Sequence, residues 1–163
     1  MSLQNFTDAN GNVDHAAAQD YMRRHYPELE GVNHANYQSD PTGQQGYRTN
    51  CGRATIAADA SINNGYAHPA PASAPTDQTT LETALGSGMQ PMSSYNQVTN
   101  ALAHEPNGTV GSVYINHTGR SVGHAFLVHK DDRGVINYVD AQNYLPADLG
   151  TNPSRIQYMR NNT

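Results

Sequence analysis

The sequence predicts an α+β fold with helices first and an antiparallel sheet after them. Up to residue 104 the apolar residues recur at helical spacing, whereas beyond the turn at 106–108 they alternate with a period of two. Short turns join the later segments, which is typical of antiparallel strands. The 163 residues are enough for one domain with its own core, so we treat residues 1–163 as a single domain. Residues 1–13 are polar and are expected to be loose or partly vector-derived.

Four segments carry helical signals. They are residues 15–26, 51–63, 79–85 and 91–104. The first is preceded by the capping residue Asp14 and stopped by Pro27. The second ends at Asn64-Gly65, a typical C-terminal signal. Residues 28–48 and the Pro- and Ala-rich stretch 66–77 are predicted to be loop.

Four segments carry strand signals. They are residues 110–116, 122–130, 135–140 and 155–159. The first three are separated by turns around Gly119 and Gly134, and this spacing predicts a β-meander.

Composition and charge exclude several classes of function. The net charge of −5 argues against a broad nucleic-acid-binding surface, because such surfaces are positively charged. No apolar run approaches the roughly 20 residues that span a membrane, and no signal peptide is visible at the start. A single cysteine excludes an internal disulfide framework and a multi-cysteine metal site. We expect no metal, no cofactor, no nucleic acid and no membrane insertion.

That cysteine, Cys51, is the candidate nucleophile. Thr49 and Asn50 before it are good capping residues, and helix formers follow. The first turn of a helix carries unpaired N–H groups and partial positive charge. A thiol placed there ionises more readily, and the thiolate is the reactive form.

A base and an orienting group are available on neighbouring strands. Of the eight histidines, His124 lies on the second predicted strand, and Asp140 ends the third. If residues 131 and 135 are paired, His124 lies opposite Gln142 with Asp140 as its diagonal neighbour; if 129 and 135 are paired, it lies opposite Asp140. Pairing 130 with 135 would separate the two groups. His129 is five positions from His124 and points the other way.

Three groups are candidates for holding an oxyanion. They are the backbone N–H of Cys51 and the side-chain amides of Gln45 and Asn50. The alternative is structural: a lone cysteine is commonly an inert buried residue, and a lone strand histidine is commonly structural.

The order of these groups resembles the papain-like fold, in which a nucleophile begins the main helix and a His and an Asn or Asp lie on the following sheet. Gln45-Gly46 is similar to the oxyanion Gln-Gly of papain-type proteases. Asn50-Cys51, Ala57-Ala58-Asp59, Gly123-His124 and Val139-Asp140-Ala141-Gln142 resemble the papain-fold toxin domains of bacterial polymorphic toxins, whose relatives include glutamine deamidases. The matching segments cover roughly residues 45–75 and 108–142.

The resemblance implies roles for individual residues. Cys51 would be the nucleophile, His124 the acid and base, and Asp140 the group that orients His124. Gln142 would belong to the motif without an assigned role. The second cysteine frequent in the toxin group is absent, because Ala54 or Thr55 stands there.

The resemblance also implies a function. The chain would deamidate glutamine side chains on a target protein, after secretion or injection by a bacterial secretion system, and would act in the target-cell cytosol. A cognate immunity protein would cover Cys51. The same triad suits a cysteine peptidase or a transglutaminating enzyme, and a third reading is a non-catalytic binding domain with a buried Cys51.

Overall fold

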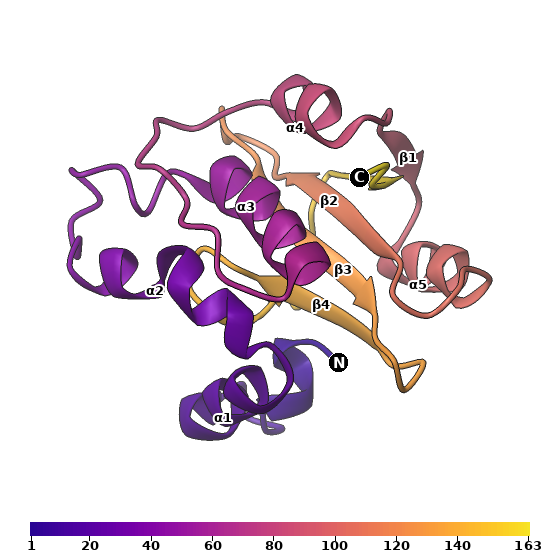
Figure 1. Ribbon diagram of the computed structural model, residues 1–163, viewed down its shortest axis with the longest axis horizontal. Helices are drawn as coiled ribbons and strands as arrows, with labels where there is room; N and C mark the ends of the chain where they lie inside the picture. The colour runs from indigo at the N-terminus through magenta and orange to yellow at the C-terminus, as the bar shows by residue number, and fades with distance from the viewer.

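A six-stranded antiparallel sheet carries the helices (Figure 1). The computed structural model describes residues 1–163. The strands are β1 (Gln90–Met92), β2 (Val110–Asn116), β3 (His124–Lys130), β4 (Ile136–Asp140), β5 (Leu145–Pro146) and β6 (Arg155–Arg160). Their spatial order is β1-β6-β2-β3-β4-β5, and every neighbouring pair is antiparallel.

The four predicted strands are confirmed as β2, β3, β4 and β6, whereas β1 and β5 were not predicted and the topology differs in one respect. β2, β3, β4 and β5 follow one another as a meander, but β6 returns to the far side of β2. There it pairs along the whole strand, from Gly111 with Arg160 to Asn116 with Arg155. This return closes the open side of β2 and leaves only the three-residue β1 and the two-residue β5 at the edges.

The α-helices are α1 (His15–His25), α2 (Glu30–Gln38), α3 (Cys51–Asn64), α4 (Gln78–Leu85) and α5 (Tyr95–Ala103). Their ends follow the local signals of the sequence. The side chain of Asp14 accepts a hydrogen bond of 3.0 Å from the N–H of Ala17 and so caps α1. Gly65 ends α3 with φ of 76°, a left-handed conformation that favours glycine.

Two predictions about secondary structure were wrong. The segment 28–48 was predicted to be loop, but a 3₁₀ turn (Pro27–Leu29) and α2 occupy its first part. Leu29, Val32 and Asn33 are buried there, so tertiary packing stabilises a helix whose polar sequence shows little periodicity. Residues 90–92 form the edge strand β1 rather than the start of a helix, and an edge strand tolerates Pro91.

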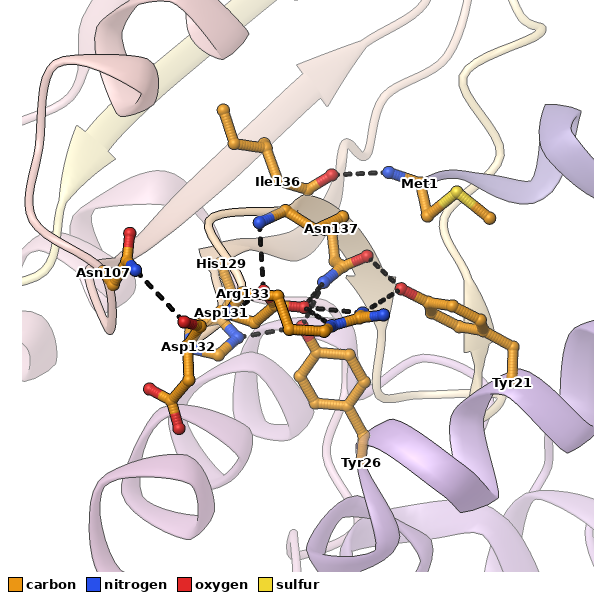
Figure 2. Close-up of polar contacts among 11 residues, drawn as sticks. Met1, Tyr21, Tyr26, Asn107, His129, Asp131, Asp132, Arg133, Ile136 and Asn137 are labelled. Carbon is orange, nitrogen blue, oxygen red and sulfur yellow. Dashed lines mark hydrogen bonds and ion pairs between the residues drawn. The ribbon is translucent and has the colours of Figure 1, made fainter.

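The first residues pack on the sheet, in contrast to the loose segment expected. Leu3–Phe6 form a 3₁₀ turn. The N–H of Tyr138 donates to the carbonyl of Met1 (2.8 Å), and the N–H of Leu3 donates to the carbonyl of Ala147 (2.9 Å). The terminal ammonium of Met1 donates to the carbonyl of Ile136, as Figure 2 shows. The chain start is therefore tied to β4.

Helices cover both faces of the sheet. On one face the small residues Ala54, Ala57 and Ala58 of α3 pack with Leu127 and Val139. On the other face Val98 and Leu102 of α5 pack with Val113, Phe126 and Val128. Because strand side chains alternate between faces, neighbours such as Leu127 and Val128 belong to different cores. The alanines bring α3 close to β3, and this fixes where the first residue of α3 lies.

A buried polar cluster links α1 to the sheet (Figure 2). Asn137 is 1% exposed and donates to Tyr26 (2.9 Å) and Asp131 (3.0 Å), while its oxygen accepts from Tyr21 (2.6 Å). The Tyr26 hydroxyl lies 2.8 Å from Nδ1 of His129. As predicted, His129 points away from His124.

Candidate active site

Cys51 is the first residue of α3 and is 6% exposed. Its N–H and the next two N–H groups have no acceptor within the helix, because they belong to its first turn. None of the three makes another hydrogen bond within the chain. Asn50 occupies the cap position, but its side chain accepts no capping hydrogen bond. The thiol therefore lies beside unpaired donors and the positive end of a helix.

The fold brings His124 and Asp140 to the same end of the domain as Cys51. Figure 1 shows α3 lying over β3, and both elements begin at this end. β4 runs antiparallel to β3, so its last residue, Asp140, returns to that end.

The register of β3 and β4 decides how these two side chains meet. Leu127 pairs with Val139 and Lys130 with Ile136. The N–H of Asp131 donates to the carbonyl of Val135 at 2.9 Å. If the same register is continued past the end of β4, His124 lies opposite residue 142. This is the arrangement expected above for the case in which residues 131 and 135 are paired. Nε2 of His124 lies 2.7 Å from Oδ2 of Asp140.

The electrostatics of His124 favour its protonated form. Burial alone would lower the pKa of the imidazole, but the charge of Asp140 and its hydrogen bond act in the opposite direction. The neighbouring Cys51 acts in the same direction as Asp140, and the pKa is raised well above its ordinary value. Since Asp140 engages Nε2, Nδ1 is the nitrogen that remains for the thiol.

Gln142 ties Asp140 to the loop before α3. Its N–H donates to Oδ1 of Asp140 at 3.0 Å, and its side-chain nitrogen lies 3.5 Å from Oδ1 of Asn50. Gln142 is buried. Its backbone thus holds the carboxylate on the side opposite His124.

The two candidate amides differ in availability. Nδ2 of Asn50 donates to Oδ1 of Asn33 (2.8 Å) and to the carbonyl of Pro71 (3.0 Å), so both of its N–H groups are engaged. Gln45 is exposed, and its side chain makes no hydrogen bond within the chain. It lines a hollow of about 510 Å³ formed by residues 43–46, 49 and 72–75, which does not include Cys51.

Sequence reasoning missed two contributors to the site. Asn33, from the segment predicted to be loop, is 1% exposed and contacts Asn50 and Gln142. Tyr114 shares a buried cluster with Cys51. A Cβ on Gly123 would lie 2.5 Å from the Tyr114 ring, so the residue before His124 has to be glycine. In the sequence, only the glycine directly before His124 indicated that another residue, here Tyr114, approaches the backbone closely at this point.

No group of three or more His, Cys, Asp or Glu residues is arranged to hold a metal ion. None of the helices has the length and hydropathy needed to cross a membrane.

Comparison with known proteins places this arrangement in a family. No curated protein sequence matches the chain. A family model described as papain fold toxin 1, glutamine deamidase, matches residues 49–143, which is more than half of the chain and includes Cys51, His124 and Asp140. The helix α3, which begins at Cys51, and the antiparallel sheet agree with a papain fold. The chain belongs to the papain-fold toxin family of glutamine deamidases.

Proposed function

We propose that this domain hydrolyses the side-chain amide of glutamine on a target protein through Cys51, His124 and Asp140. The observation that carries the proposal is the 2.7 Å contact between His124 and Asp140 beside a thiol at a helix N-terminus. The family match supports the same chemistry.

In the first half of the reaction, the Cys51 thiolate, whose proton His124 already holds, attacks the carboxamide carbon. The tetrahedral intermediate then expels ammonia, which takes that proton, and a thioester remains. In the second half, His124 accepts a proton from water as the water attacks the thioester. The second tetrahedral intermediate formed in this way collapses, releases a glutamate side chain and restores the Cys51 thiolate, with the proton left on His124. The target gains one negative charge.

Two donors serve the oxyanion in this proposal. The backbone N–H of Cys51 has no acceptor within the chain. The Gln45 amide has no competing hydrogen bond and joins it when the substrate is bound. Asn50 is better suited to holding the loop, because its amide is already engaged.

The toxin family suggests the biological setting. We infer that the domain is delivered by a bacterial secretion system, acts on a protein in the target-cell cytosol, and is neutralised by a cognate immunity protein that covers Cys51. Residues 1–163 act as one catalytic domain.

The test is mass analysis of a target-cell lysate digest after incubation with the wild-type chain or Cys51→Ala. Conversion of a glutamine to glutamate adds about one dalton, since OH replaces NH₂. We expect such a change only with the wild type. Cys51-dependent cleavage products would instead indicate a peptidase.

A second measurement addresses the low exposure of Cys51, which a non-catalytic domain would also show. We expect iodoacetamide to modify Cys51 of the folded protein rapidly near neutral pH. Resistance until denaturation, together with no mass change in the digest, would refute the enzymatic proposal.

A further inference from the structure

The side chain of Asn33 lies between the two halves of the candidate site. It comes from α2 and is 1% exposed. Its Nδ2 donates to the carbonyls of Tyr47 (3.0 Å) and Gln142 (2.9 Å). Its Oδ1 accepts from Nδ2 of Asn50 (2.8 Å). Because carbonyl oxygens only accept, these partners also define which end of the amide is nitrogen.

Two of the three partners of Asn33 lead to different reacting groups. Asn50 immediately precedes Cys51 and begins α3. Gln142 donates its backbone N–H to Oδ1 of Asp140, whose Oδ2 contacts His124. One buried amide therefore joins the loop that carries the nucleophile to the strand end that carries the carboxylate.

We propose that Asn33 is a positioning residue that holds Asp140 and Cys51 in register on either side of His124. The inference rests on the proposed function, because it assigns Asn33 to the same triad. Asn33 touches none of the three reacting side chains through its own hydrogen bonds, and it acts through Gln142 and Asn50.

The physical reason is the short reach of the contacts involved. A hydrogen-bonded carboxylate supports an imidazolium only while donor and acceptor stay within about 3 Å and aligned. Without Asn33 the carbonyl of Gln142 loses a buried donor, and the 140–142 segment gains freedom to move away from His124. The charged and titratable groups that face His124 are Asp140 and Cys51, so either displacement changes its protonation.

Asn137 provides a matched control. It is also 1% exposed, and its amide also makes several hydrogen bonds, which Figure 2 shows, but it lies near the start of β4, whereas Asp140 ends that strand. Asn33→Ala and Asn137→Ala each remove one buried amide. A purely structural role for Asn33 would make the two variants alike.

The experiment follows the His124 ring resonance against pH by NMR, with His124→Gln used to assign it. In Asn33→Ala we expect the titration midpoint to move down toward the ordinary histidine value, and in Asn137→Ala to remain that of the wild type. The rate of Cys51 alkylation near neutral pH should fall on the order of ten- to a hundred-fold only in Asn33→Ala. Neither readout needs the target protein, so failure here is distinct from failure of the deamidation test.

A partial replacement adds a second arm. Asn33→Ser keeps one donor and should give a smaller change in the same direction. Equal midpoints and equal alkylation rates in the Asn33 and Asn137 variants would overturn the proposal. So would loss of folding in both Asn33 variants while Asn137→Ala stays folded, because Asn33 would then serve the fold rather than the site.

Discussion

Nε2 of His124 lies 2.7 Å from Oδ2 of Asp140, although sixteen positions separate the two residues along the chain. The hairpin of β3 and β4 creates this contact by returning the chain to the end where α3 begins. The contact leaves Nδ1 of the ring for Cys51. It also places a carboxylate where it stabilises an imidazolium.

Asp140→Asn tests this electrostatic role, since it keeps the shape and removes the charge. Burial would lower the pKa of His124, but the charge of Asp140 and its hydrogen bond raise that pKa above its ordinary value. The substitution should lower that pKa, so that His124 loses its proton at a lower pH. The alkaline limb of the pH–rate profile should therefore shift to lower pH. We expect deamidation near neutral pH to fall by about 10²- to 10⁴-fold, as measured by initial rates across pH.

The matched control is Asp59→Asn. Asp59 is a buried carboxylate of α3 that accepts from Asn161 and Thr163, away from the site. Its replacement should leave the rate profile in place. Identical profiles for Asp140→Asn and the wild type would contradict the assigned role.

Gln45→Ala tests the oxyanion donor. Removing one such donor typically costs about 10²- to 10³-fold in kcat. Gln44→Ala is the control, because it removes the neighbouring exposed amide from the same hollow. We expect a large loss of kcat for Gln45→Ala alone. Equally small effects on kcat in the two variants would show that Gln45 does not donate to the oxyanion, and that the backbone N–H groups of α3 are its donors.

Gly123→Ala tests the close approach of Tyr114 to the strand that begins with His124. The added Cβ would lie 2.5 Å from the Tyr114 ring, so ring or strand has to move. We expect a loss of about 1–3 kcal/mol in the free energy of unfolding and slower alkylation of Cys51. Gly88→Ala is the control, since its Cβ would meet only Glu82 at 3.7 Å. Unaltered alkylation in Gly123→Ala would show that Tyr114 has room to adjust.

His129 makes the stability of the fold depend on pH. Burial lowers its pKa, with Asp131 and Asp132 opposing that effect. The unfolded chain therefore binds a proton more readily than the folded one, so this contribution is present above about pH 6.5 and is lost as pH falls. Lowering the pH from 7.5 to 5.5 should therefore reduce the urea midpoint of the wild type relative to that of His129→Gln, while the raised pKa of His124 acts in the opposite direction in both proteins. His15→Gln, at an exposed site, should follow the wild type.

Local signals predicted much of the secondary structure. Asp14 and Gly65 mark the ends of two helices through their own backbone and side-chain preferences, which need no distant partner. The alternation of the later strands was equally clear. The helix α2 was missed because it is stabilised by burial of Leu29, Val32 and Asn33, which the local pattern does not show.

The kinds of side chain in the candidate site could be predicted from local patterns: one cysteine at a helix start, and a histidine and an aspartate on adjacent strands. The sequence left the register between those strands open, with odd and even loops all consistent with the residues. The tertiary structure decided the register, and with it whether His124 and Asp140 meet. It also decided that Asn50 is engaged, that Gln45 is free, and that Asn33 lies between Asn50 and Gln142. Sequence patterns assign a residue to an element and a face, but a hydrogen bond forms only when donor and acceptor lie within about 3 Å of each other.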